Sequence, residues 1–171
     1  MGIAANQARL MTLTARKNDL ELRAQQISAI KMRLSQTTST LAQNYSDALN
    51  NYTRLNAAQQ LSKQDPDGYY VLDKNGNYTS AQQGDAGAFK GSELLNKVAT
   101  ALHVEVNSAS EYLTFKQAEY TTETDRVSAQ EKVYDMELTE VNTEHTAIKT
   151  EYDAIKSLIG DNVEKSFNVF G

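Results

Sequence analysis

The sequence predicts an all-α protein: a long antiparallel two-helix coiled-coil hairpin with a small α+β insert at its tip. Three observations support this fold class. Apolar residues recur every seven positions between residues 13 and 55, and again between residues 113 and 155. The segment between them, residues 63–105, carries the turn and strand signals of a small folded insert. Two stripes of equal length joined by a return segment make an antiparallel hairpin the simplest arrangement.

The first stripe predicts a continuous helix from Leu13 to about Leu61. The whole first helix covers about residues 3–62, in which residues 3–12 either extend it or stay frayed until a partner binds. Apolar residues spaced by seven keep one line along a helix facing a single partner. No Pro lies in this stretch and no Gly follows Gly2 in it, and these two residues are the ones that most disfavour a helix interior. The stripe consists of Leu13, Leu20, Ile27, Leu34, Leu41, Ala48 and Leu55.

The second stripe predicts a matching helix over about residues 108–159. Ser108 and Glu111 have the spacing of a capping box at its start. Gly160 stands where a left-handed C-cap would end it, which leaves residues 161–171 as a short C-terminal tail. The stripe consists of Leu113, Tyr120, Val127, Tyr134, Val141, Ile148 and Ile155.

The insert, residues 63–105, is predicted to hold a β-hairpin and a short helix. Residues 64–68 form a turn cluster around Pro66 that stops the first helix. Residues 69–72 are rich in aromatic and branched side chains and predict a strand, which Asn75–Gly76 turns back into residues 77–80. Ser92 is the expected N-cap of a helix over 93–102. At 171 residues, the length suits a single domain.

Charge is distributed unevenly along the chain. Residues 1–62 carry seven Lys and Arg against three Asp and Glu, whereas residues 106–171 carry six against thirteen. A basic helix beside an acidic one is complementary within one chain, so the basic half does not indicate a nucleic-acid partner. If the two stripes face each other in full, Lys17 lies opposite Glu151 and Lys31 opposite Glu137.

Composition excludes several classes of protein. With no Cys, the chain has no disulfide, thiol catalyst or cysteine-ligated metal. No run of 18 apolar residues predicts a transmembrane helix. The N-terminus lacks the features of a cleaved signal peptide. We therefore expect either secretion by a route without a cleaved signal or, as the alternative, a cytoplasmic location.

No set of residues has the spacing of a catalytic, cofactor or metal site. The Asp and Asn residues near Asp73 suggest calcium, but Gly76 and Gly84 fall at the wrong positions for an EF-hand loop. His103 and His145 lie far apart, and no phosphate-binding loop is present. The sequence thus predicts a protein that is not an enzyme and has no cofactor, metal, small-molecule substrate or nucleic-acid partner.

Apolar residues off the two stripes predict association with itself or with another helical protein. Two helices paired along one seam leave such residues uncovered. The chain ends, which meet at one end of an antiparallel hairpin, are the expected assembly surface. It consists of Ile3, Leu10, Met11, Val163, Phe167, Val169 and Phe170.

Paired terminal helices around a short central insert, the lack of Cys and the apolar chain ends together resemble the flagellin and type III secretion filament subunits. The opening Ala4-Ala5-Asn6-Gln7-Ala8-Arg9-Leu10 is similar to a start in that family. The resemblance implies a bacterial structural subunit whose terminal helices pack in a filament core and whose central segment is displayed outward. The alternative is a cytoplasmic coiled-coil adaptor or chaperone that binds a partner helix along its apolar face.

Overall fold

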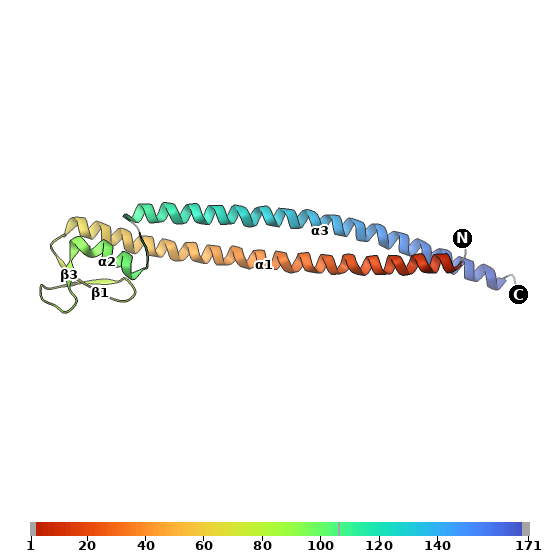
Figure 1. Cartoon of the computed structure of the whole chain (residues 1–171), viewed down its shortest axis with the longest axis horizontal. Coiled ribbons are helices and arrows are strands. Elements are labelled where there is room, and N and C mark those ends of the chain that lie inside the picture. Colours follow the sequence, from red (N-terminus) through yellow and green to blue (C-terminus); the bar gives the residue numbers. More distant parts are fainter. Residues whose placement is uncertain (1–2, 106, 169–171) are drawn as a thin grey trace. The chain divides into compact units, whose positions relative to one another are not determined.

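The protein is mostly helical. The computed structural model describes residues 3–105 and 107–168, apart from the side chains of Ile3 and residues 166–168. A long helix, α1 (Ile3–Gln64), and a second long helix, α3 (Ala109–Asn168), pack together, and a small three-stranded sheet lies in the insert between them in sequence (Figure 1). The predicted helical fold with a small sheet-containing insert is confirmed at this level.

The chain packs as two compact units, of which the first combines residues 1–36 with residues 127–171. Its core is a cluster of buried residues spaced by seven on each helix: Leu13, Leu20, Ile27, Val141, Ile148 and Ile155. Ion pairs join Arg9 to Glu151 and Lys31 to Asp135, so α1 and α3 run antiparallel in this unit (Figure 1).

The second unit, residues 37–126, contains the insert together with the end of α1 and the start of α3. Strands β1 (Tyr69–Leu72), β2 (Tyr78–Ala81) and β3 (Phe89–Lys90) form an antiparallel sheet in the order β2-β1-β3. A 3₁₀ turn, η1 (Gly91–Glu93), then leads into helix α2 (Leu94–Ala101). The predicted strand 69–72 and its return are confirmed, whereas the two-residue strand β3 was not predicted.

The insert is held to the long helices by an apolar core. Leu55 and Ala58 of α1 and Leu94 and Val98 of α2 are fully buried. Tyr112, near the start of α3, is buried in the same cluster. The covering of α1 by α2 therefore gives the second unit a globular core, which the paired helices alone would not supply.

Gly91 allows the insert to close against the end of α1. A Cβ placed on Gly91 would lie 2.1 Å from the carbonyl oxygen of Asp65, a backbone atom that cannot move aside cheaply. The Gly91 amide donates to the Gly68 carbonyl at 2.8 Å, and the Ser92 amide donates to the Pro66 carbonyl at 2.9 Å. These bonds tie η1 to the turn that follows α1.

The same bonds explain why the expected N-cap at Ser92 was wrong. Ser92 lies within η1, and α2 begins only at Leu94, after Glu93, whose side chain makes no capping hydrogen bond. The backbone amide of Ser92 is bound by Pro66. The chain must therefore make one tighter turn before α2 starts. Helix α2 then ends at Ala101 rather than at residue 102.

The predicted end of the second long helix at Ile159 was also wrong. Helix α3 continues through Gly160 to Asn168, so most of the expected tail, 161–171, is helical. One glycine in a helix interior costs about 1 kcal/mol relative to alanine, and no Pro follows to stop the hydrogen-bond ladder. The helix therefore passes through a residue that resembled a C-cap.

The capping box at the start of α3 is present in modified form. The Ser108 Oγ accepts a hydrogen bond from the Glu111 amide at 3.2 Å, as expected of an N-cap. The Glu111 carboxylate accepts from the amide of Asn107 at 3.2 Å, one residue before the position that the motif predicts. The bond to Ser108 satisfies an amide of the first turn, which has no partner within the helix, whereas the bond to Glu111 holds the residue before the cap.

Candidate interaction surface

The predicted seam residues line the inside of the paired helices in each unit. Nine of the fourteen stripe positions are buried: Leu13, Leu20, Ile27, Ala48, Leu55, Val127, Val141, Ile148 and Ile155. The other five are partly buried: Leu34, Leu41, Leu113, Tyr120 and Tyr134. Beside the insert, Ala109 and Tyr112 of α3 are buried, whereas the stripe residue Leu113 is only partly buried. The seven-residue spacing carries no signal for Tyr112, because α2 and the sheet are what cover it.

The ion pairs between the helices differ from the predicted ones. Glu151 pairs with Arg9, and Lys17 instead lies 3.6 Å from Glu21, one turn along its own helix. Lys31 pairs with Asp135 rather than with Glu137. The expected contacts were therefore wrong although the antiparallel direction was right. Spacing fixes which side of a helix faces its partner, but a long flexible side chain can reach a different carboxylate near that side, as Lys31 reaches Asp135.

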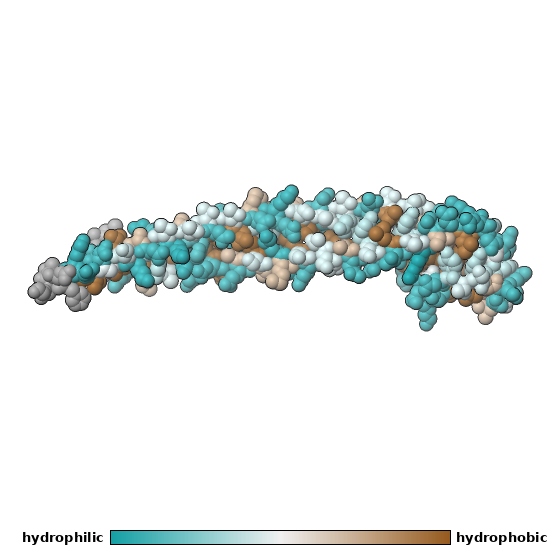
Figure 2. All heavy atoms as spheres, turned by 180° about the vertical axis from the view of Figure 1, so that it is seen from behind, coloured by the Kyte–Doolittle hydropathy of each residue, from teal (hydrophilic) through white to brown (hydrophobic). Residues whose placement is uncertain are grey.

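Large apolar side chains remain exposed on the outside of the first unit. Met11, Met32 and Met136 are 75%, 66% and 65% exposed, and Leu22 and Val133 are about half exposed. Figure 2 shows hydrophobic residues, in brown, reaching the surface between hydrophilic ones. Single exposed apolar residues are ordinary, but several along one pair of helices indicate an interaction surface.

The predicted assembly surface at the chain ends is described only in part. Met11 and Val163 are exposed. Leu10 is partly buried against the core of the first unit, so the chain itself covers much of it. Ile3 and Phe167 lie in α1 and α3, but their side chains are outside the described set, and Val169 and Phe170 lie outside the described residues.

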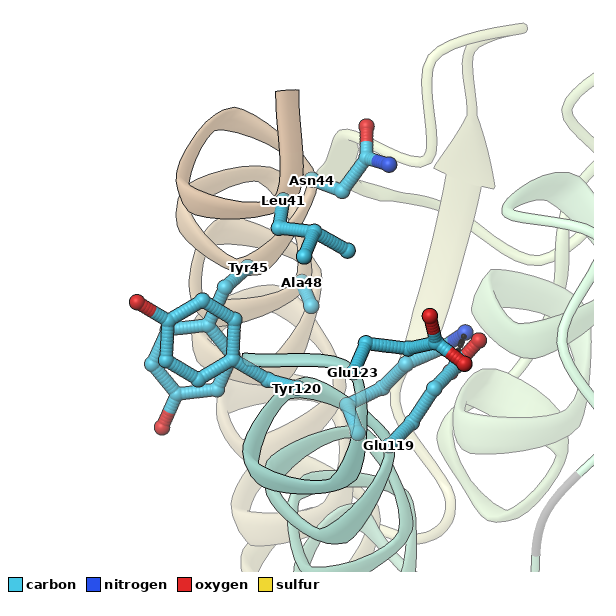
Figure 3. Close-up of a pocket in the computed structure, with 8 residues that line it drawn as sticks. Leu41, Asn44, Tyr45, Ala48, Glu119, Tyr120 and Glu123 are labelled. Carbon is cyan, nitrogen blue, oxygen red and sulfur yellow. Dashed lines mark hydrogen bonds and ion pairs between the residues drawn. The ribbon is translucent and has the colours of Figure 1, made fainter. Parts of the chain in front are cut away.

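The second unit has a cavity between its parts of α1 and α3. The rings of Tyr45 and Tyr120 stack along one side with centroids 4.6 Å apart (Figure 3). Glu119 and Glu123 lie on another side, and Lys116 donates to Glu119 at 2.8 Å. The volume, about 180 Å³, is well below the roughly 300–1,000 Å³ of most small-molecule sites. Its position beside Ala48, the smallest residue of the stripe, marks it as a packing gap.

Titratable groups with shifted pKa values lie in the insert and serve its folding. Three hydrogen bonds hold the Asp73 carboxylate, which accepts from the amides of Asn75 and Asn77 and from the Asn77 side chain. The bonds from Asn77 are the main cause that lowers the pKa of Asp73. Burial is the largest cause that raises the pKa of Tyr70, and the hydrogen bond from its hydroxyl to Asp65 adds to this. Asp73 thus stabilises the turn at Gly76, where φ is +80°.

Two further features bear on ligands and membranes. Among the residues that the structure describes, no three His, Cys, Asp or Glu side chains are grouped closely enough to hold a metal ion. His145 instead lies 3.2 Å from Glu21, joining the two helices of the first unit. Within the described ranges, no helix has the length and hydrophobicity needed to cross a bilayer.

Comparisons with protein-family models, with curated proteins and with solved structures gave no match to this chain.

Proposed function

We propose that this protein is a structural, self-associating subunit, built as an antiparallel two-helix coiled coil, of an exported bacterial filament or secretion apparatus. The observation that carries the proposal is the set of large apolar side chains exposed on both helices of the first unit, Met11, Leu22 and Met32 on α1 and Met136 on α3. Covering such a surface stabilises the complex by about 25 cal/mol for each Å² of apolar area removed from water. A surface of this kind on a helical subunit favours association.

Two arguments support the coiled-coil form and the filament class. Buried residues recur every seven positions on both helices of the first unit, as in a coiled coil. The paired terminal helices around a central insert resemble the architecture of flagellin-type subunits, whose terminal helices pack against other copies. The proposal includes export of this subunit by a route that needs no cleaved signal peptide.

The competing function is a cytoplasmic adaptor or chaperone that binds a helix of another protein on the same exposed residues. The two functions differ in stoichiometry. Identical subunits whose contacts do not close into a ring form an assembly that lengthens without limit. An adaptor instead forms one small complex of fixed composition.

Sedimentation velocity of the purified protein over a wide concentration range tests the proposal. We expect a size distribution that broadens and shifts upward continuously with concentration. A single species of constant size over the whole range would contradict a filament subunit and would favour the adaptor, and a size equal to the monomer would exclude self-association altogether.

A further inference from the structure

Helix α1 carries a second stripe, on the side opposite its buried one. Met11, Ala15, Leu22, Ala29 and Met32 lie on this stripe, and Asn18 and Gln25 fill the positions between them, so the spacing alternates between four and three. All seven residues are uncharged and exposed. Leu22 is two residues beyond buried Leu20, about 200° around the helix. Alternating spacing of three and four is the pattern of a helix that packs along a second helix.

Helix α3 carries a matching stripe of small residues on its outer side. Met136 is followed at the same alternating spacing by Thr139, Thr143, Thr146 and Thr150, all exposed. The hydroxyl of each threonine donates to the carbonyl four residues earlier, at 2.8–2.9 Å. Since these hydroxyls are satisfied by the helix itself, each side chain offers its methyl group to a partner. Thr139, Thr143 and Ala147 line a shallow groove beside Met136, and the carboxylates that complete its lining are Asp135, Glu140 and Glu144.

The two stripes fit each other in size and in charge. The α1 stripe presents large flexible side chains, Met11, Leu22 and Met32, whereas the α3 stripe presents methyl groups between which they can insert. Residues 3–36 carry six Lys and Arg against two Asp and Glu, whereas residues 127–168 carry four against nine. Among the described residues, neither Arg23 nor Glu140, which adjoin the two stripes, makes an ion pair. Opposite charge of this kind already pairs α1 with α3 within the chain, as in Arg16 with Glu144.

We propose that the exposed α1 stripe of one copy binds the threonine stripe on α3 of a second copy. The inference rests on the proposed self-association and names its interface. Because each bound copy still has one free stripe of each kind, the contact is heterologous and can add subunits at both ends.

Two variants that each destroy one stripe test this interface. Leu22→Glu places a carboxylate on the α1 stripe, facing an acidic partner, and Thr143→Glu places one in the groove on α3. Each variant alone should require at least about tenfold more protein to associate than the wild type. Both positions are exposed, so circular dichroism should show unchanged helix content. Gln83→Glu, an exposed position in the insert, adds the same charge elsewhere and should associate like the wild type.

Mixing the two variants gives the decisive result. The intact α1 stripe of the Thr143→Glu protein can bind the intact α3 stripe of the Leu22→Glu protein, but neither remaining stripe can extend the complex. Sedimentation of the mixture should show one-to-one dimers that do not grow. The interface is wrong if either variant associates like the wild type or if the mixture stays monomeric. Monomeric wild-type protein would instead overturn the proposed function as well.

Discussion

At the residue scale, a side chain's place on the inner or outer stripe decides what its removal does. Ile27 and Val141 are 3% and 1% exposed in the core of the first unit, whereas Leu22 is 53% exposed. All three are aliphatic residues within helices. The difference in the effect of replacing them by alanine therefore comes from burial rather than from helix propensity.

Ile27→Ala should lower the free energy of unfolding by about 2–4 kcal/mol, because a buried cavity is left behind. Leu22→Ala should change it by less than about 0.5 kcal/mol. Urea denaturation, at a protein concentration low enough to keep copies apart, measures both. Equal losses for the two variants would show that the buried and exposed faces of α1 are wrongly assigned.

The Asp73 carboxylate provides a pH test of the insert. Hydrogen bonds from Asn77, and to a smaller extent from the amide of Asn75, lower its pKa from the ordinary value of 3.8, so the turn gains stability from ionised Asp73. That contribution is present above pH 3.8 and is lost as the pH falls through the lowered pKa. The amide NMR signals of Asn75 and Asn77 should titrate with a midpoint below 3.8.

Asp73→Asn is the control for this titration, since it removes the ionising group but keeps an acceptor oxygen. The low-pH transition of the two amides should disappear in that variant. A wild-type midpoint at or above 3.8 would mean that the bonds from Asn77 do not favour the carboxylate.

At the element scale, periodicity predicted the long helices better than their ends. Seven-residue spacing and the absence of Pro predicted the body of α1, and the turn around Pro66 predicted its end near Gln64. Neither decided whether residues 3–12 would join the helix, which begins at Ile3. The end of α3 was missed because Gly160 was interpreted as a cap, although its cost inside a helix is small. The strand β3 and the turn η1 depend on contacts with residues 66–70, which no local pattern reveals.

Gly160→Ala tests the course of α3 directly. A Cβ at Gly160 meets no atom within 4 Å, so alanine should raise the free energy of unfolding by about 0.5–1 kcal/mol through its higher helix propensity. Thermal denaturation compares it with Gly76→Ala. That control should destabilise the protein, because Gly76 has φ +80° and its Cβ would lie 3.2 Å from Leu102. A loss of stability for Gly160→Ala would restore the C-cap interpretation.

At the scale of the whole molecule, function depends on what covers the outer apolar residues. The sequence indicated association because apolar residues lay off the stripes. It placed the assembly surface at the chain ends, and the structure adds the second stripe of α1 and the threonine stripe of α3. The threonine stripe could not be inferred from residue type alone, because the hydroxyl bonds to the carbonyls four residues earlier are visible only in the structure.

Electron microscopy of concentrated wild-type protein shows whether the subunits self-associate into an open-ended assembly. Heterologous contacts between identical subunits predict particles of uniform width and variable length that lengthen with protein concentration. Images that show only small particles of one fixed size, at every concentration, would contradict the account.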